Sequence, residues 1–482
     1  TVATTDGGSS TVTVNITGTN DVPVITSTVA ASSGDVIESG HADDNSVVAG
    51  TVTATGQLTA SDVDANDDAT NQTWTVTSPL VGTYGSIAIT AAGVWTYTLD
   101  NSAGSAADVL DEGDVVTDSF TVQVADGHGG VATQTVTVTI NGTNDKPTID
   151  AANTVVAGTV TESGLTPAGA AEAGTPSASG QLATLDVDAG ASTQTWNVQG
   201  TPSTTYGSFA VDGNGLWTYT LDNSLVATQA LDVTDQVTQS YTVRVTDDFG
   251  AYVDQTVVIT INGTNDVPVI TSTVAASSGD VIESGHADDG TAVAGTAVAT
   301  GQLTASDVDA EDNAGNQTWS LDGVPSATYG SFAINASGEW TYTLNNSLAA
   351  TQALDEGDEV TETFAVQVAD GNGGVATQSV NVTITGTNDV PVITNNAAAL
   401  AGAVTESGLT PAGAAEAGTV TATGTLSASD VDTDATQAWS VQGANSTTYG
   451  SFSVDPATGV WTYTLDNSLV ATQALDVTDQ VT

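Results

Sequence analysis

Residues 135–145 read TVTVTINGTND, an alternating run of threonine and β-branched apolar residues that ends in a Gly-Thr-Asn-Asp corner. Val136, Val138 and Ile140 fall on one side of an extended chain, with the period of two expected of a half-buried strand. Residues 119–126, SFTVQVAD, alternate in the same way. The two stretches therefore predict β-strands, and the corner predicts a turn that follows the second strand.

The corner belongs to a unit that occurs four times, with the copies about 122 residues apart. The run WTYTL has the same period and begins at Trp95, Trp217, Trp340 and Trp461. A period of this length marks an array of domains of ordinary size and excludes a solenoid of short repeats. The first and third copies share DVIESGHADD, and the second and fourth share TESGLTPAGAAEAGT, which indicates duplication of a two-unit block.

The repeat period sets the expected domain boundaries. We expect complete repeats at residues 21–144, 145–265 and 266–388, and a fourth repeat at 389–482 that lacks its final two strands. Residues 1–20 match the last strand of a preceding repeat, so we expect the sequence to be a segment of a longer protein. About seven short strands per unit, separated by Gly, Asn, Asp and Ser clusters, predict an all-β protein of tandem β-sandwich domains.

Composition limits the possible partners. The chain has 57 acidic residues against only Lys146 and Arg244, a formal charge of −55 that excludes nucleic acid and anionic membranes as electrostatic partners. It has no cysteine and three scattered histidines, so carboxylate and carbonyl oxygens are the plentiful metal ligands. Such ligands favour a hard cation, Ca²⁺ or Mg²⁺. No apolar run reaches the roughly 18 residues of a membrane span.

Acidic residues recur at constant separations within the copies. In all four, the glutamate of ESG keeps one separation from the aspartate of the corner before it, and the first aspartate of DVD keeps another from that glutamate. In the three complete copies, the aspartates of LD, of ADG or TDD, and of the next corner are also separated identically. In the first copy these residues are Asp21, Glu38, Asp62, Asp111, Asp126 and Asp145. The loops after DVD differ in length, so the spacing of the carboxylates is constant where neighbouring segments are not.

The DVD motif suggests what the constant spacing does. If residues 62–64 are extended, Asp62 and Asp64 point to one side and Val63 packs inward on the other. Two carboxylates 4 Å apart repel each other by about 1 kcal/mol even in water. A divalent cation would turn that repulsion into coordination.

The motifs of the repeat, taken in order, resemble those of a known family. The string L.ASDVD, YGSF.VD, WTYTLDNS, ALD and TVTVTINGTND, in this order, resembles the VCBS repeat of large bacterial surface proteins and repeat-in-toxin-type adhesins. The string also looks like a cadherin repeat, with TGTNDVPVI at the Asp-x-Asn-Asp-Asn linker, LTASDVDA at Ala-x-Asp-x-Asp and ALDEGD at Leu-Asp-x-Glu. The resemblance implies calcium-binding, immunoglobulin/cadherin-like β-sandwiches, arranged in tandem as an elongated rod.

Cadherin-type roles imply calcium ligands at each joint, which we define as the corner between two repeats together with the acidic residues on either side. For the first joint they are Glu38, Asp111, Asn144, Asp145, Asp186, Asp188 and Asp247. For the second they are Glu162, Asp232, Asn265, Asp266, Asp307, Asp309 and Asp370. For the third they are Glu283, Asp355, Asn388, Asp389, Asp430 and Asp432. The matching residues at the start of the first repeat are Asn20, Asp21, Asp62, Asp64 and Asp126.

The sequence departs from the cadherin pattern at three places. The final linker asparagine of cadherins is Val or Lys here, and the LD element continues as EGD or VTD. The first linker aspartate of cadherins is Gly142, Gly263 or Gly386 here, which predicts fewer ions per joint. DVDANDDATNQT lacks the glycine and glutamate of an EF-hand loop, and DGHGG at 126–130 is expected to be a hairpin turn. We expect His41 and His286 to be exposed loop residues, and the tryptophans to be core residues instead of sugar-stacking ones.

Taken together, these observations favour a calcium-rigidified extender, or stalk, of a bacterial cell-surface adhesin that supports cell adhesion and biofilm formation. The resemblance implies an extracellular location and type I secretion. The expected partners are calcium ions, neighbouring repeats and cell-surface molecules that contact regions outside this sequence. The alternative is that the repeats themselves are adhesive or homophilic modules. An enzyme is not expected, because every candidate carboxylate pair occurs in several copies.

Overall fold

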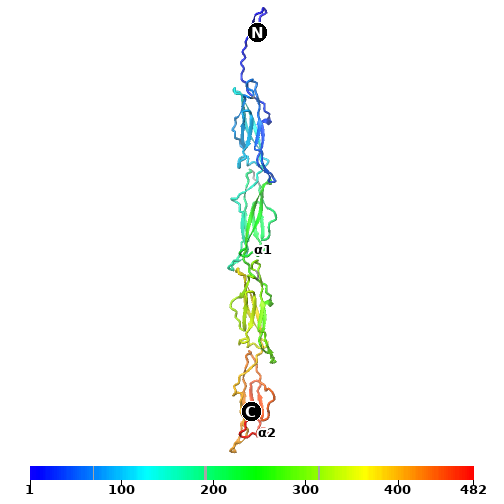
Figure 1. The fold of residues 1–482 in the computed structure, drawn as a ribbon, viewed down its shortest axis with the longest axis vertical. Coiled ribbons are helices and arrows are strands. Elements are labelled where there is room, and N and C mark those ends of the chain that lie inside the picture. Colours follow the sequence, from blue (N-terminus) through cyan, green and yellow to red (C-terminus); the bar gives the residue numbers. More distant parts are fainter. Residues whose placement is uncertain (69, 189–192, 313–314) are drawn as a thin grey trace. The chain divides into compact units, whose positions relative to one another are not determined.

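The computed structural model describes residues 1–68, 70–188, 193–312 and 315–482, and Figure 1 shows the chain coloured along its sequence. The chain divides into two compact units. The first contains residues 1–163 and 173–264, and the second contains residues 164–172 and 265–482. The first unit thus holds the first two repeats, except for one hairpin, and the second unit holds that hairpin with the last two repeats.

The first repeat is built from short strands and one 3-10 helix. Its elements are β3 (Val24–Ile25), η1 (Val29–Ser32), β4 (Ser33–Ile37), β5 (Gly40–His41), β6 (Val47–Val48), β7 (Thr53–Gln57), β8 (Ala60–Ser61), β9 (Thr73–Val76), β10 (Gly85–Ile89), β11 (Val94–Leu99), β12 (Val115–Ala125) and β13 (Val131–Asn141). Among the described residues, seven of these strands have four residues or more, in agreement with the number predicted.

Two sheets form the sandwich of the first repeat. One has the strand order β4-β13-β12-β9, and the other has the order β10-β11-β7. The long strands β12 and β13 pair antiparallel from Val115 opposite Asn141 to Ala125 opposite Val131, so the DGHGG stretch is the hairpin turn that was predicted. Strand β4 joins the outer edge of β13 in parallel. This pairing brings the end of β4 beside the end of β13, where the next repeat begins.

Aromatic residues fill the space between the sheets. Trp95 and Tyr97 of β11 are fully buried, as the alternation of WTYTL predicts, and Trp74 of β9 is also buried. The indole of Trp95 donates a hydrogen bond to the carbonyl of Ala31 at 2.9 Å. The corresponding tryptophans of the second and third repeats are buried as well, which confirms that these residues are part of the core.

The second and third repeats follow the same order. The second contains β14 (Thr148–Ile149), β15 (Ala157–Thr161), β16 (Gly164–Leu165), β17 (Ala171–Glu172), β18 (Ser177–Gln181), β19 (Thr184–Leu185), β20 (Thr195–Val198), β21 (Gly207–Val211), β22 (Leu216–Leu221), α1 (Val226–Gln229), β23 (Gln236–Thr246) and β24 (Tyr252–Asn262). The third contains β25 (Val269–Ile270), η2 (Val274–Ser277), β26 (Ser278–Ile282), β27 (Gly285–His286), β28 (Ala292–Val293), β29 (Val298–Gln302), β30 (Ala305–Ser306), β31 (Thr318–Leu321), β32 (Gly330–Ile334), β33 (Glu339–Leu344), β34 (Glu359–Ala369) and β35 (Val375–Thr385). Each has a four-stranded and a three-stranded sheet, which confirms the all-β, tandem-sandwich fold class.

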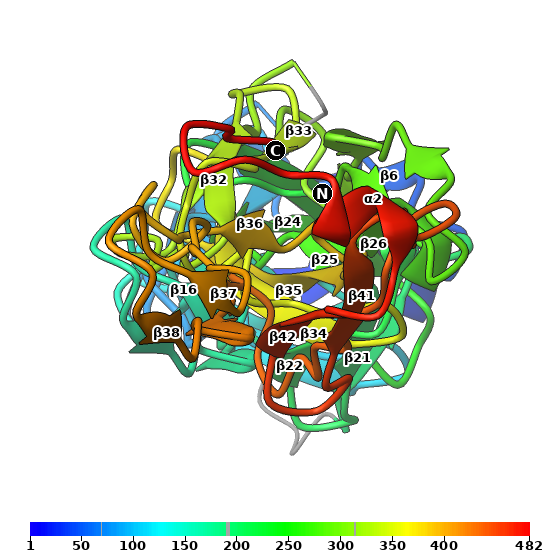
Figure 2. The ribbon, with the colours of Figure 1, turned by 90° about the horizontal axis from the view of Figure 1, so that it is seen from below.

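Of the two sheets of the sandwich, the described residues of the fourth repeat form only the three-stranded one, of order β39-β42-β41. Its elements, several of which are labelled in Figure 2, are β36 (Val392–Ile393), β37 (Gly408–Leu409), β38 (Ala415–Glu416), β39 (Thr421–Thr425), β40 (Ala428–Ser429), β41 (Gly450–Val454), β42 (Val460–Leu465) and α2 (Val470–Gln473). Trp439, which corresponds to Trp74 of β9, lies outside any strand and is only half-buried. A strand at this position needs the long strand that β12 supplies in the first repeat.

Residues 1–20 contain only the short pair β1 (Val2–Ala3) and β2 (Ser9–Ser10). The predicted strand around TVTVNI at 11–16 is not formed, and Val12, Val14 and Ile16 are exposed. The sequence pattern of a last strand is present there, but a strand exists only where a neighbouring strand accepts and donates its backbone hydrogen bonds.

Candidate metal centres at the joints

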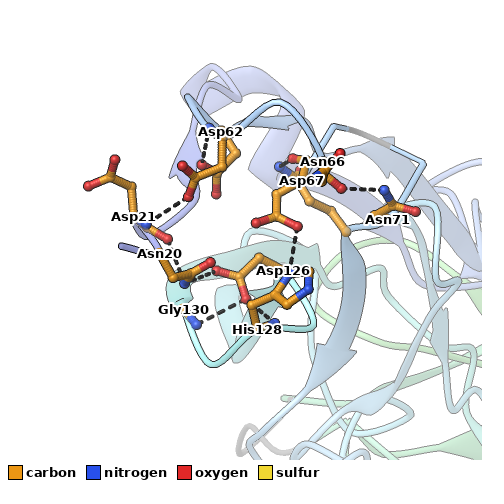
Figure 3. A network of polar contacts seen from close by, with 11 residues as sticks. Asn20, Asp21, Asp62, Asn66, Asp67, Asn71, Asp126, His128 and Gly130 are labelled. Carbon is orange, nitrogen blue, oxygen red and sulfur yellow. Dashed lines mark hydrogen bonds and ion pairs between the residues drawn. The ribbon is translucent and has the colours of Figure 1, made fainter. Parts of the chain in front are cut away.

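The acidic residues at the start of the first repeat are held together by the corner itself, as Figure 3 shows. The side-chain amide of Asn20 donates to Asp126 Oδ2 at 3.0 Å, and the backbone N–H of Asp21 donates to Asp64 Oδ2 at 2.7 Å. Asp64 in turn donates its backbone N–H to Asp62 Oδ1 at 3.1 Å. Hydrogen bonds through the corner therefore link the five predicted ligands at this position, while the carboxylate of Asp21 points away from the others in Figure 3.

Asp126 is fixed by the turn between β12 and β13. Its Oδ1 accepts hydrogen bonds from the backbone N–H groups of His128 at 2.7 Å and Gly130 at 3.0 Å. A Cβ atom at Gly130 would lie 2.0 Å from Asp126 Oδ2, so only glycine fits beside the carboxylate. The imidazole of His128 contacts the buried carboxylate of Asp67 at 2.8 Å (Figure 3).

One detail of the predicted DVD geometry is wrong. Val63 does not pack inward, because its side chain is 82% exposed. Strand β8 ends at Ser61, and residues 62–64 form a bend in which the backbone of Asp64 hydrogen-bonds to the side chain of Asp62. The two carboxylates converge through this local turn instead of through strand alternation.

At the first joint, the linker backbone binds carboxylates from both repeats. The N–H of Thr143 donates to Glu38 Oε2 at 3.2 Å, and the N–H of Asp145 donates to Asp188 Oδ2 at 2.7 Å. The Asn144 amide donates to Asp247 Oδ2 at 3.2 Å. The linker thus draws the end of β4 in the first repeat and two loops of the second repeat to one place.

Burial and mutual repulsion make these carboxylates hard to ionise. Burial, with smaller contributions from the charges of Asp145, Asp188 and Asp108, raises the pKa of Glu38 to about 8 despite the opposing hydrogen bond from Thr143. Burial and nearby aspartates likewise raise the pKa of Asp188 to about 7 and that of Asp145 to about 6. Burial, with smaller effects of neighbouring aspartates, also raises the pKa values of Asp111 and Asp186. Five of the seven residues predicted for this joint therefore influence one another electrostatically, and Asn144 joins Asp247 to them through its hydrogen bond.

At the first joint, carboxylate oxygens of Glu38 and Asp188 are buried without a donor among the described residues. Within the described part of the chain, neither Glu38 Oε1 nor Asp188 Oδ1 has a hydrogen-bond partner. Glu38 is completely buried, and carboxylate oxygens of Glu38, Asp108 and Asp145 lie within 4.8 Å of one another. Because buried carboxylates need a counter-charge, and oxygen ligands suit hard cations, these residues fit a site for Ca²⁺.

The third joint repeats this arrangement. Asp389 N–H donates to Asp432 Oδ2 at 2.6 Å, and Thr387 N–H donates to Glu283 Oε2 at 3.4 Å. Burial raises the pKa of Glu283 to about 7, with smaller contributions from Asp389 and Asp432, whose own pKa values are raised by burial. The negative charge of Asp430 also raises the pKa values of Asp389 and Asp432, and the charge of Asp355 raises that of Asp432. Asn388 donates its side-chain amide to the carbonyl of Asp389 at 3.0 Å.

Comparison with protein families identifies the repeats. Residues 20–142, 144–263 and 265–386 each match the family described as bacterial cadherin-like domain. The chain belongs to this family. Solved structures similar to it include mouse cadherin-23 EC22-24, with 14% identity over 77% of this chain and 100% of that chain and a TM-score of 0.38. Another is the protocadherin GammaB4 extracellular domain, with 16% identity over 96% of this chain and 64% of that chain and a TM-score of 0.39.

A search of curated proteins finds no significant match. In the residues that the structure describes, no helix has the length and apolar character required to cross a membrane.

The residues predicted for the second joint are divided between the two compact units. Glu162 and Asp232 belong to the first unit, where Gln229 Nε2 donates to Glu162 Oε1 at 2.7 Å. In the second unit, Asn265 donates to Asp370 Oδ2 at 3.0 Å and Asp266 N–H donates to Asp309 Oδ2 at 2.7 Å. Carboxylate oxygens of Asp307, Asp312 and Asp370 lie within 4.8 Å of one another. The start of the third cadherin-like repeat thus matches the start of the first.

Several residues of the clusters were missed by the sequence analysis. Asp67 and Asp312 lie within the loops after DVD, whose variable length hid their equivalence, and both are buried. Asp108 lies in a segment that has no acidic counterpart in the other repeats. In the sequence, Asp108 differs from the other repeats only as an aspartate three residues before the LD aspartate, where the others have glutamine.

The prediction that His41 and His286 are exposed loop residues is wrong. His41 belongs to β5, which pairs with β6, and its backbone N–H donates to the carbonyl of Asn144 at 2.6 Å. Its side chain is 18% exposed, with Nδ1 3.8 Å from Asp145 Oδ1. His286 of β27 binds Asn388 in the same way at 2.7 Å. Burial, with Lys146 as a second cause, lowers the pKa of His41, so the imidazole does not supply the missing counter-charge.

Proposed function

We propose that this chain is a calcium-rigidified extender segment of a bacterial cell-surface adhesin that supports cell adhesion and biofilm formation. The observation that supports this most strongly is the set of buried, donor-less carboxylate oxygens at the joints, such as Glu38 Oε1 and Asp188 Oδ1 at the first and Asp389 Oδ2 and Asp432 Oδ1 at the third. Cadherin-like repeats are structural or adhesive modules. The same domain recurs in every copy, and this repetition suits an extender better than a single ligand-binding domain.

Calcium would supply the positive charge that the clusters lack. The proposed ligands at the first joint are the seven predicted residues, of which Glu38, Asp145 and Asp188 carry the strongest support from burial and pKa. At the third joint they are the six predicted residues, and at the start of the first repeat the five predicted there. Of the seven predicted for the second joint, Glu162 and Asp232 lie in the first unit and the other five lie at the start of the third repeat. The linker N–H groups orient these carboxylates, and their remaining oxygens are available to the ion.

The proposal extends to location and assignment. We propose an extracellular, type I secreted protein of the VCBS and repeat-in-toxin adhesin class, because a chain of charge −55 with calcium-dependent folding suits export from a calcium-poor cytosol. We also propose repeat boundaries at 21–144, 145–265, 266–388 and 389–482, with residues 1–20 as the last strand of a preceding repeat. Limited proteolysis with and without calcium tests the boundaries, because cleavage in chelator should concentrate at the corners.

Thermal unfolding tests the calcium proposal directly. Extracellular calcium modules bind at about 10⁻⁴ to 10⁻³ M. At a hundredfold excess over the dissociation constant, one site adds about 2.7 kcal/mol to the folded state. We expect about 10 mM Ca²⁺, a hundredfold excess at the tighter of these dissociation constants, to raise the melting temperature of the chelated chain, with Na⁺ at matched ionic strength having little effect. Equal melting curves with Ca²⁺ and Na⁺ would refute a specific calcium role.

A further inference from the structure

Position 108 distinguishes the first repeat from the other three. The residue three places before the aspartate of LD is Asp108 in the first repeat and a glutamine in the others, namely Gln229, Gln352 and Gln473. Each glutamine donates a hydrogen bond from Nε2 to Oε1 of the ESG glutamate in its own repeat, at 2.7, 3.0 and 2.9 Å respectively. In these repeats the amide therefore partners one oxygen of the glutamate.

In the first repeat this donor is replaced by a second acid. An ionised aspartate has no hydrogen to donate, and among the described residues Glu38 Oε1 has no hydrogen-bond partner. Glu38 is completely buried, and its carboxylate lies within 4.8 Å of those of Asp108 and Asp145. The other oxygen, Oε2, accepts from the linker N–H of Thr143, as Glu283 accepts from Thr387 in the third repeat. The two joints thus share their linker contacts and differ in the group that faces Oε1.

Among the described residues, neither the lysine nor the arginine of the chain compensates for the exchange, and burial lowers the pKa of the nearby His41. In the parts of the chain described, Lys146 forms no ion pair with Glu38, Asp108 or Asp145. One oxygen of Asp108, Oδ2, accepts from the N–H of Gly104 at 2.6 Å, which fixes the side chain in its loop. The exchange therefore adds a negative charge to a buried cluster and leaves a buried oxygen without a donor, a combination that a bound cation would stabilise.

We propose that Asp108 is an additional calcium ligand, and that it makes the joint between the first and second repeats a tighter calcium site than the joint between the third and fourth. This inference rests on the proposed function, in which the joints bind calcium. Calcium affinity in proteins is set by the number of charged ligands and by the rigidity of the site. A glutamine at this position offers at most a neutral carbonyl oxygen. The first joint would then bind calcium at a lower calcium concentration than the third joint.

Reciprocal substitutions in the whole chain test the proposal. Asp108→Gln gives the first repeat the residue of the other three, and Gln352→Asp gives the third repeat the residue of the first. Glu112→Gln is the matched control, because it removes one exposed charge from the same loop. Calcium titration of the chelated chains by calorimetry should show that Asp108→Gln weakens the tightest class of sites about tenfold or more. Gln352→Asp should add a second site to that class, and Glu112→Gln should change neither.

A second measurement guards against a trivial effect on folding. In chelator, Asp108→Gln should raise the melting temperature, because the introduced amide can donate to Glu38 Oε1, while its calcium-induced shift should be smaller than that of the unchanged chain. If Asp108→Gln leaves the tightest affinity within about twofold while calcium still binds, the role of Asp108 is overturned and the proposed function survives. If the unchanged chain binds no calcium at millimolar concentration, both are overturned.

Discussion

At the scale of single residues, the carboxylates of the first joint give the reason to propose a bound cation. Glu38, Asp145 and Asp188 are drawn together by linker N–H groups, yet burial raises the pKa values of all three, to about 8, 6 and 7. The linker hydrogen bonds thus hold together groups that destabilise one another when charged. An ion with six to eight oxygen ligands satisfies the same arrangement.

Replacement of Asp188 by alanine tests one ligand. We expect Asp188→Ala to lower the calcium-dependent rise in melting temperature, because the loss of a ligand weakens a site worth about 2.7 kcal/mol at a hundredfold excess of calcium. The melting temperature in chelator should change little, since the mutation removes one hydrogen bond from Asp145 but also a carboxylate oxygen without a donor. Asp35→Ala on the exposed face of β4 is the control. An unaltered calcium shift in Asp188→Ala would show that this residue is not a ligand.

The raised pKa values also predict how stability depends on pH. Ordinary values are 4.5 for Glu38 and 3.8 for Asp188, so between about pH 4 and pH 8 the calcium-free folded chain binds more protons than the unfolded chain. The free energy of unfolding must therefore fall as the pH rises through this window. In chelator we expect the melting temperature to be higher at pH 5 than at pH 8, and the difference to persist in about 1 M salt, which screens surface repulsion. Millimolar calcium should stabilise the chain most at pH 8, and a chelated chain that is more stable at pH 8 than at pH 5 would contradict the assignment.

At the scale of secondary-structure elements, the linker glycines account for the departure from the cadherin pattern. A Cβ atom at Gly142 would lie 2.4 Å from the carbonyl oxygen of Asp111, and one at Gly386 would lie 2.6 Å from that of Asp355. The end of the last strand thus passes too close to the LD segment for any side chain. An aspartate cannot stand there in these repeats, whatever its value as a ligand.

Alanine at Gly386 measures this close approach. The added methyl group would also lie 2.6 Å from Leu354 Cβ, so the backbone must move. We expect Gly386→Ala to destabilise the chain in chelator by about 1–3 kcal/mol, the usual cost of overpacking. Gly213→Ala is the control, because nothing lies within 4 Å of a Cβ at that exposed turn. Equal denaturant midpoints for the two variants would show that the linker has room for a side chain.

The elements that could be predicted from the sequence are those with a strong local pattern. Alternation predicted β11, β12 and β13 and the burial of Trp95, and the repeat period predicted a sandwich per repeat. The hairpin β5–β6 has no such pattern, because it consists of two-residue strands held to the linker by a hydrogen bond from His41. Val63 was misplaced for the same reason, since a turn held by the Asp62 side chain leaves no period in the sequence.

The sequence predicted which acidic residues belong to the candidate site, but not which side chains pack around each of them. Constant spacing indicated the ligands that the linker fixes, such as Asp145 and Asp188. Asp108 was not found, because a single-copy change is visible only once the packing of Gln229, Gln352 and Gln473 against their glutamates is known. Contacts of this kind join residues far apart in the sequence and follow no local rule.

At the scale of the whole molecule, calcium should control how freely the repeats move against one another. The first and third joints each gather carboxylates from two successive repeats, and in chelator their charges repel at neutral pH, so the proposed extender should bend at its corners. Bound calcium would tie both sides of a joint to one ion and restrict that bending. We therefore expect small-angle X-ray scattering in millimolar calcium to give a longer and better defined maximum dimension than in chelator. Asp188→Ala should show an intermediate profile, because only the first joint is weakened. Identical profiles with calcium and with chelator would reject the extender mechanism even if calcium binds, because the ions would then stabilise the individual domains without stiffening the array.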